Sequence, residues 1–288
     1  MSAMTDAQVA AVRVPTGGLG QEARAAFAVW QREMIRFVKD RARIVSSLVQ
    51  PVLFLFVLGV GLSSIVTAGR GSVDFTTFLF PGVLALSVLF TAAFSGISMV
   101  WDREFGFLRE MLVAPVSTTA ILTGKCVGGA TVATLQSLVL LALAGVVGVP
   151  YAPVMLLALV GLLFLMAFMI TALGLVLAAR IKQVQSAMPM VQLIITPLMF
   201  LSGALFPLSG LPTWLAVVTH LNPMTYAVEP MRAVVFDNLD VDPATRATLD
   251  PGIFWFGWPV PIWLQVILVV ACSVALLGVA VARFARTE

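Results

Sequence analysis

The chain of 288 residues is 60% hydrophobic and 11% charged, with a mean hydropathy of +1.04 and a net charge of +3. A soluble domain carries about 25% charged residues, so this composition excludes a water-soluble globule and predicts an integral membrane protein. A single histidine and two cysteines exclude most metal sites, a Cys-His nucleophile and a disulfide scaffold. We therefore expect no catalytic residue, no metal and no cofactor bound by the chain itself.

The N-terminal region has two parts. Residues 1–20 are rich in Pro, Gly and small side chains without periodicity, and we expect them to be disordered. Residues 21–43 predict an amphipathic helix that lies along the cytoplasmic membrane surface. Its apolar face is formed by four side chains at helical spacing: Phe27, Trp30, Met34 and Phe37. Two roles stay open, a simple anchor and an anchor that also touches a cytoplasmic partner.

Six uncharged runs are long enough to cross a bilayer core of about 30 Å. They cover residues 44–66, 77–100, 126–148, 154–179, 187–209 and 259–282. Outer-membrane barrels show short alternating segments instead. We therefore predict an all-α integral membrane protein whose six transmembrane helices form one domain over 44–282, followed by a cytoplasmic tail over 283–288.

Basic residues orient this bundle. Of 17 Lys and Arg, seven precede the first span, three lie in 101–125, two lie in 180–186 and two follow the last span. Fourteen therefore lie on one side and three on the other, which places both termini in the cytoplasm by the positive-inside rule. We expect a multi-pass protein of the cytoplasmic membrane in contact with lipid. The net charge then reports topology and does not indicate a nucleic-acid partner.

The first cytoplasmic loop is too long for a turn and too short for a domain. Residues 101–118 mix charged side chains with Phe, Leu and Met, which favours a short amphipathic helix ended by Ala114-Pro115. The alternative is a solvated connector with ordinary surface charges. Just beyond it, Gly124 and Gly128 would permit close helix approach, and we expect Lys125 to extend to the cytoplasmic headgroups.

The segment 210–258, between the fifth and sixth runs, holds two apolar pieces too short to span. Pieces of this length are often re-entrant or interfacial helices, and Pro212 and Pro223 suit the breaks between them. We therefore predict a re-entrant helical hairpin. Within it, Glu229 and Arg232 are three residues apart, so we expect them to pair with each other rather than contact a substrate.

The same hairpin contains Tyr226, which we expect to form a hydrogen bond across it. Bulky side chains of the second and fifth runs could line a pathway, since such side chains adapt to varied apolar ligands. These candidates are Phe90, Phe94, Met199 and Phe200. Facing the lipid is the competing interpretation for them.

Several kinds of chemistry are absent from the sequence. Gly124-Lys125 is followed by Cys126 and lacks the earlier glycine of GxxxxGK[ST], so the chain has no ATP site of that kind. None of the six runs contains an ionisable Asp, Glu, Lys, Arg or His, which disfavours an ion-coupled transporter or a membrane enzyme. The chain therefore has no energy source of its own and could be driven by a cytoplasmic partner.

Three features together give the chain a resemblance to a known family. The first loop reads Glu104-Phe105-Gly106, Glu110-Met111-Leu112 and Ala114-Pro115-Val116-Ser117, and closes with Gly124-Lys125. The stretch from Ile195 to Arg232 matches a second signature, and the third feature is the order of helix, six spans and hairpin. In these features the chain resembles the membrane subunit of type 2 ABC exporters, of the daunorubicin-resistance and nodulation-factor-export kind.

The resemblance implies a permease subunit that is not itself an enzyme. Two permease subunits, expected to be identical, would pair above two cytoplasmic ABC ATPase subunits that use ATP and Mg. The resemblance makes the first loop the ATPase-coupling helix, with these residues: Asp102, Glu104, Phe105, Gly106, Phe107, Leu108, Glu110 and Pro115. The expected activity is export of a hydrophobic drug, antibiotic or lipid-like molecule.

Two alternatives stay open. The first is export of a polysaccharide or other cell-envelope precursor. A carbohydrate path is expected to be rich in Tyr and Trp, and the chain has only two tyrosines, which disfavours this alternative. The second is a membrane enzyme or assembly factor without transport, which the absence of clustered acids in the six runs disfavours.

Overall fold

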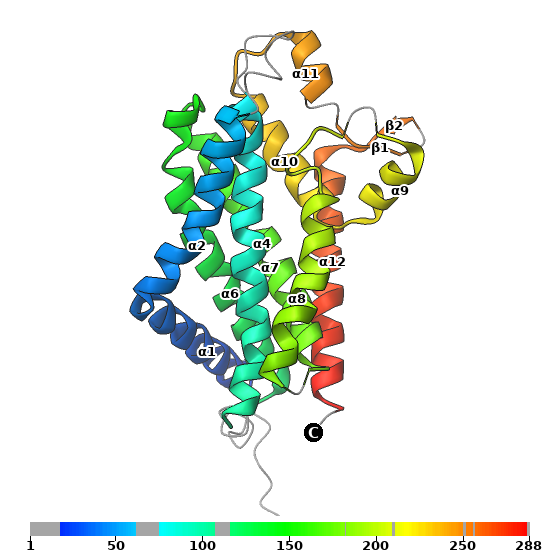
Figure 1. The fold of residues 1–288 in the computed structure, drawn as a ribbon. Coiled ribbons are helices and arrows are strands. Elements are labelled where there is room, and N and C mark those ends of the chain that lie inside the picture. Colours follow the sequence, from blue (N-terminus) through cyan, green and yellow to red (C-terminus); the bar gives the residue numbers. More distant parts are fainter. Residues whose placement is uncertain are drawn as a thin grey trace, which may run out of the picture.

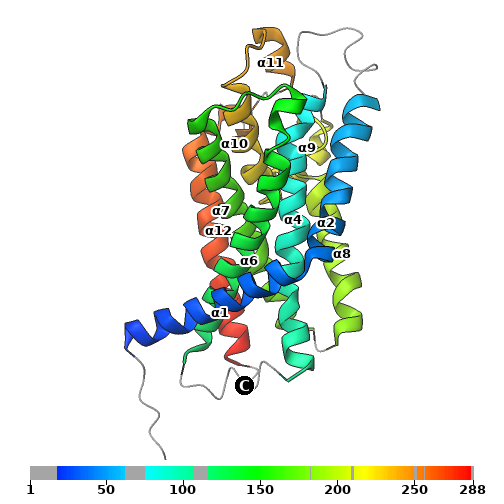
Figure 2. The ribbon, with the colours of Figure 1, turned by 90° about the vertical axis from the view of Figure 1, so that its left-hand side faces the viewer.

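A computed structural model describes residues 18–61, 75–106, 116–181, 183–208, 211–249, 252–255 and 257–286. The described chain is a helical bundle, shown in two views in Figures 1 and 2. Helix α1 (Leu19–Lys39) crosses one end of the bundle obliquely and breaks at Asp40. Helix α2 (Arg41–Leu53) then turns along the bundle and continues through a π-helical turn, Phe54–Leu58, to Gly61.

Helix α4 (Phe75–Glu104) is buried on most sides along its length and forms the centre of the bundle. It packs against α6 (Thr118–Leu141) and α7 (Pro153–Ala178), while α12 (Ile262–Phe284) covers α7. A short 3₁₀ turn, Ala144–Val147, links α6 to the turn before α7. These helices form because their apolar runs are long and mostly unbroken, and backbone groups in a membrane must bond within their own segment.

Five described segments are long and apolar enough to cross a membrane: Ile44–Gly61, Phe75–Glu104, Thr118–Leu141, Pro153–Ala178 and Ile262–Phe284. The predicted run 187–209 becomes a shorter apolar helix, α8 (Val184–Phe200). It ends there because the chain turns after Phe200, with Gly203 at a φ of 72°. The described helices therefore support an all-α membrane protein with five clear spans.

Short elements fill the end of the bundle opposite α1 (Figure 1). They are α9 (Thr213–Leu221), α10 (Thr225–Phe236), α11 (Pro243–Leu249) and the paired strands β1 (Phe254–Trp255) and β2 (Trp258–Pro259). The strands are antiparallel, with Phe254 opposite Pro259. Helix α10 packs against α4, α7 and α12, whereas α9 lies at the periphery.

Several predicted boundaries shift. The helix predicted over 21–43 divides at Asp40 into α1 and the first residues of α2, and the run predicted over 126–148 corresponds to α6, which begins at Thr118 and ends at Leu141. Helix α1 begins at Leu19 rather than at residue 21, and residues 1–17 of the expected disordered region lie outside the described chain. The helix expected over 101–115 does not start at Trp101, because Trp101–Glu104 complete the last turn of α4. The chain leaves that helix through Gly106, whose φ of 82° favours glycine.

Candidate functional site

The last turn of α4 stands at the end of the bundle that also holds α1 and the C-terminus (Figures 1 and 2). Three consecutive residues there, Asp102, Arg103 and Glu104, contact three different parts of the molecule. Because successive helical residues point about 100° apart, one turn can reach several neighbouring helices at once. Phe105 follows and is 69% exposed.

Asp102 belongs to a buried ion network that joins α1, α4 and α6. Lys125 on α6 donates to Glu33 of α1 at 2.8 Å and to Asp102 of α4 at 2.7 Å. All three residues are buried, and the Lys125 side chain is only 1% exposed. The expectation that Lys125 extends to the headgroups is therefore wrong: two carboxylates nearby hold its ammonium inside the protein.

Two arginines of α1 complete this network. The Arg32 guanidinium donates to the Asp102 carboxylate at 3.0 Å and lies 3.8 Å from Glu33. Arg36 lies 3.6 Å from the other Asp102 oxygen, Oδ1, which accepts no hydrogen bond within the described chain. Three cations thus surround two carboxylates, and each buried charge has an opposite partner, as burial requires.

Close packing of α1 on α6 brings these charges together. A Cβ atom at Gly124 would lie 2.4 Å from the Ala26 carbonyl oxygen, and one at Gly128 would lie 2.9 Å from the Glu33 side chain. The predicted close approach at these two glycines is thus confirmed, and it occurs within one chain. Trp30 adds a hydrogen bond to Thr131 at 3.2 Å.

The face that α1 turns to the bundle is not wholly the one predicted. Phe27 is 60% exposed, whereas Val29 and Glu33 are buried. The four predicted apolar side chains therefore form only part of the face of α1 that packs on the bundle, because the same face also carries Glu33, which contacts Lys125.

Arg103 and Glu104 connect α4 to the remaining helix ends. Arg103 donates to the carbonyl oxygens of Ala178 and Ile181, at 3.1 and 3.0 Å, at the C-terminal end of α7. Its guanidinium also lies 5.2 Å from the centre of the Phe284 ring at the end of α12. The Glu104 carboxylate accepts a 2.7 Å hydrogen bond from the Val184 backbone N–H, the first of α8. A carboxylate there stabilises the helix N-terminus.

The eight residues expected in the coupling segment therefore fall into two groups. Asp102 is buried in the ion network, Glu104 caps α8, and Phe105 and Gly106 follow in the turn. The other four lie outside the described residues: Phe107, Leu108, Glu110 and Pro115.

At the opposite end of the bundle, α10 carries a second buried ion pair. Arg232 lies 3.4 Å from Glu229, and both side chains are buried, which confirms that the two residues pair. The Arg232 guanidinium also donates to the Gly203 carbonyl and lies 4.6 Å from the centre of the Phe78 ring. It therefore joins α10 to α4 and to the turn that follows α8.

The predicted breaks of this region are confirmed. Helix α9 begins directly after Pro212, and Pro223 lies between α9 and α10. Tyr226 donates to the His220 carbonyl oxygen at 2.8 Å and accepts from the Trp255 indole at 2.9 Å. The predicted hydrogen bond from Tyr226 across this pair of helices is thus present.

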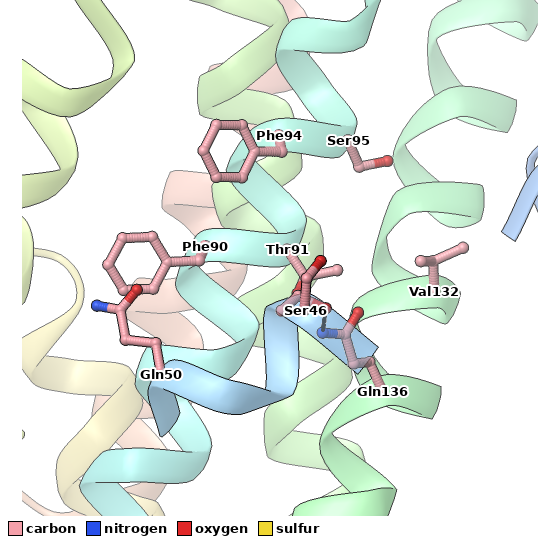
Figure 3. Close-up of a pocket in the computed structure, with 9 residues that line it drawn as sticks. Ser46, Gln50, Phe90, Thr91, Phe94, Ser95, Val132 and Gln136 are labelled. Carbon is pink, nitrogen blue, oxygen red and sulfur yellow. Dashed lines mark hydrogen bonds between the residues drawn. The ribbon is translucent and has the colours of Figure 1, made fainter. Parts of the chain in front are cut away.

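A cavity of about 160 Å³ opens between α2, α4 and α6 (Figure 3). Two of the predicted lining residues, Phe90 and Phe94, border it. The other two are on α8, where Met199 is buried and Phe200 is exposed, and they do not line this cavity.

Comparison with known proteins identifies the family. The family model described as ABC-2 type transporter matches residues 24–236, from α1 through α10. The chain belongs to the ABC-2 type transporter family.

Its relatives carry transport or nodulation names. Nodulation protein J of Rhizobium leguminosarum bv. trifolii is 30% identical over 219 residues, which cover 75% of this chain and 82% of that protein. A protein named transport permease ycf38 of Cyanophora paradoxa is 27% identical over 209 residues, 72% of each chain. A protein described as the multidrug ABC transporter permease YbhR of Escherichia coli is 25% identical over 172 residues, 59% of this chain and 47% of that protein.

In this ABC-2 family member, sequence reasoning missed how the ion network forms. The helix predicted over 21–43 was defined by its apolar face, without a role for Glu33, Arg32 or Arg36, and Lys125 was assigned to the headgroups. One signal could have found the network: Glu33 lies one turn from Trp30, beside the apolar stripe, where a carboxylate needs a cation. The described residues contain no group of three or more His, Cys, Asp or Glu that could hold a metal ion.

Proposed function

We propose that this ABC-2 family member is the membrane-spanning subunit of an ATP-driven exporter. The observation that carries the proposal is the last turn of α4. That turn leads directly into the segment that resembles the family's coupling helix, ends in the exposed Phe105, and is bound behind it to α1, α6, α7 and α8. A displacement of this end of α4 would therefore be transmitted to α1, α6, α7 and α8. The absence of a GxxxxGK[ST] sequence supports ATP hydrolysis by a separate subunit.

The proposal includes six crossings with both termini in the cytoplasm. Helix α7 ends, and α12 begins, at opposite ends of the bundle (Figures 1 and 2). This placement supports one further crossing between them, and α8 is the helix that runs in this direction. Its 17 residues are about 25 Å long, and the turn after it extends this path. The end that holds the C-terminus is the one rich in Lys and Arg, which supports a cytoplasmic assignment.

Helices α9 and α10 are proposed to be the re-entrant hairpin of this permease domain, 44–282. Support comes from the burial of α10 against three long helices and from its internal Glu229–Arg232 pair, which allows charges to lie at membrane depth. The partners are two ABC ATPase subunits, a second identical permease subunit and membrane lipid. ATP and Mg are used by the ATPase and not by this chain.

The substrate class that we propose is a hydrophobic or amphipathic molecule, such as a drug, an antibiotic or a lipid-like compound. The name of the relative YbhR, a multidrug permease, supports this class. Export of a polysaccharide or cell-envelope precursor is the alternative within transport. A membrane enzyme or assembly factor is the alternative outside it, and membership in a transporter family disfavours it.

Co-purification tests the exporter proposal. The chain is expressed with a candidate ABC ATPase subunit and reconstituted in nanodiscs, and the recovered complex and its ATPase activity are measured. Phe105→Ala is compared with Trp214→Ala, since both side chains are 69% exposed and Trp214 is on α9 at the other end of the bundle. Glu104→Gln removes a charge but keeps an acceptor for the Val184 N–H.

We expect wild type and Trp214→Ala to retain the ATPase, and Phe105→Ala to lose it or its membrane-dependent activity. An ATPase that never binds would overturn the exporter proposal. An ATPase that binds equally to wild type, Phe105→Ala and Glu104→Gln would overturn the assignment of these two residues to the coupling contact.

A further inference from the structure

The cavity between α2, α4 and α6 opens at the surface of the bundle, where Gln50 and Phe94 are exposed. Its lining surface is mostly apolar, but six of its nine lining side chains carry a polar group. Nine residues surround its volume of about 160 Å³. They come from α2, α4 and α6 (Figure 3). They are Ser46, Ser47 and Gln50 of α2, Phe90, Thr91, Phe94 and Ser95 of α4, and Val132 and Gln136 of α6. Four hydroxyls and two amides thus surround two aromatic rings, without a charge.

Some of these polar groups already have partners. The Gln136 amide donates to the Ser47 hydroxyl, which donates in turn to the Ile44 carbonyl at 3.1 Å. Gln50 and Thr91 differ: within the described part of the chain, neither side chain forms a hydrogen bond. An amide without a partner in an apolar medium costs roughly 4–8 kcal/mol relative to water. Gln50 is exposed and Thr91 is half-buried, and both lie in segments long and apolar enough to cross a membrane. Lipid would therefore surround these two polar groups unless a polar partner enters the cavity from outside the chain.

We propose that this cavity binds the uncharged polar head of an amphipathic molecule, which is the transported substrate. The inference rests on the proposed export function. A hydroxyl, ether or amide in the head would bond to Gln50 and Thr91, while its apolar body would contact Phe90 and Phe94 and continue toward the lipid. A cavity of about 150 Å³ holds a benzene-sized group, so the site takes a head or ring rather than a whole lipid.

The absence of charge sets the chemical class. Among the nine lining residues, none carries a charge opposite to that of an ionised head, and an ion without a counter-charge away from water is strongly disfavoured. Phosphate, carboxylate and ammonium heads are therefore disfavoured in this cavity relative to neutral heads. Neutral glycerol, sugar or amide heads match the donors and acceptors that Gln50, Thr91 and Gln136 present.

The cavity also lies on the same helix faces as the ion network. Ser95 precedes Asp102 by seven residues on α4, and Val132 follows Lys125 by seven residues on α6. Seven residues are two helical turns, or about 10 Å, and return to nearly the same face. The bound head would therefore lie on the seam that ends in the Asp102–Lys125 pair, so that a shift of α4 against α6 changes both sites.

Photolabelling of the full chain in phosphatidylcholine nanodiscs tests the site. The probe is a monoacylglycerol that carries a benzophenone near its head, and labelled peptides are mapped by mass spectrometry. Competitors of equal chain length carry a neutral glycerol, an ammonium or a carboxylate head. Gln50→Leu and Thr91→Val are the test variants. Gln192→Leu and Thr196→Val on α8 are matched controls, since these two side chains bond to each other at 3.0 Å and do not line the cavity.

We expect label in 46–50, 90–95 and 132–136, displaced at least tenfold better by the neutral competitor than by either charged one. Each test variant should lower labelling about fivefold, as expected for one lost hydrogen bond, and the controls should label like wild type. Even labelling of all lipid-facing helices, equal displacement by charged competitors, or equal loss in the controls would overturn the proposal. Localised labelling without ATPase recovery would refute export and leave the binding site standing.

Discussion

Replacement of Lys125 by Met removes the cation at the centre of the buried ion network while it keeps the length of the side chain. Glu33 then keeps only Arg32, at 3.8 Å, while Asp102 keeps Arg32 and Arg36, at 3.0 and 3.6 Å. Loss of one partner from a buried pair costs about 3–5 kcal/mol. Because both carboxylates keep an arginine, we expect the lower value, about 3 kcal/mol, and a local opening of α1 from α6.

Cys126 is a reporter for this part of the bundle, because it follows Lys125 on α6 and is buried, so that a reagent reaches its thiol only when the packing around it opens. In a Cys272→Ala background, the rate at which a thiol reagent modifies Cys126 measures how often the region opens. A cost of about 3 kcal/mol predicts a rate about a hundredfold higher in Lys125→Met than in wild type. Lys39→Met removes the same charge from an exposed position of α1 and should leave the rate unchanged.

The decisive variant combines Lys125→Met with Glu33→Gln and Asp102→Asn. With no carboxylate left to compensate, the penalty for an unpaired buried charge disappears, and Cys126 should regain most of its protection. Equal labelling of Lys125→Met and wild type would refute the reasoning, because the network would then contribute nothing to holding α1 on the bundle.

Two further predictions concern the opposite end. Gly82→Ala would place a Cβ atom 1.8 Å from the Ala204 carbonyl oxygen, so we expect about 1–3 kcal/mol of destabilisation in thermal unfolding; Gly161→Ala, with no atom within 4 Å of the new Cβ, should not destabilise the protein. Arg232→Met should reduce stability by about 3–5 kcal/mol and Arg232→Met with Glu229→Gln by much less; equal losses in the single and double variants would contradict the pairing.

Hydropathy predicted most of the fold because the spans are long, apolar and separated by charged loops. Three of the predicted runs correspond closely to α4, α7 and α12, whereas the run 126–148 begins eight residues after the start of α6 and ends seven residues beyond its end. The run 187–209 was predicted too long, since residues 201–206 stay mostly apolar after the helix ends. The positive φ of Gly203 marks the turn that follows the helix, and average hydropathy does not detect such a turn.

The ion network could be predicted only in part. Asp102 was singled out from the loop motif, and the glycines of α6 indicated a close helix contact. The partner of Lys125 could not be read from periodicity, because Glu33 lies 92 residues earlier in the chain. A lysine at the edge of an apolar run fits the headgroup region equally well on sequence alone, and only the docked α1 decides between the two environments.

Burial of this network costs desolvation energy, so we infer that its main contribution is a unique register of α1, α4 and α6 rather than stability. Apolar residues of the same size would hold α1 on α6 as well or better, but small residues such as Gly124 and Gly128 fit against many positions of a partner helix. Bonds of 2.7 and 2.8 Å from one ammonium to Asp102 and Glu33 exist in only one register. The network therefore fixes α1, α4 and α6 relative to one another at the point where α4 ends, three residues before the exposed Phe105. Any displacement of that end must either carry α1 with it or break a buried ion pair, so α1 and α4 are expected to move as one unit.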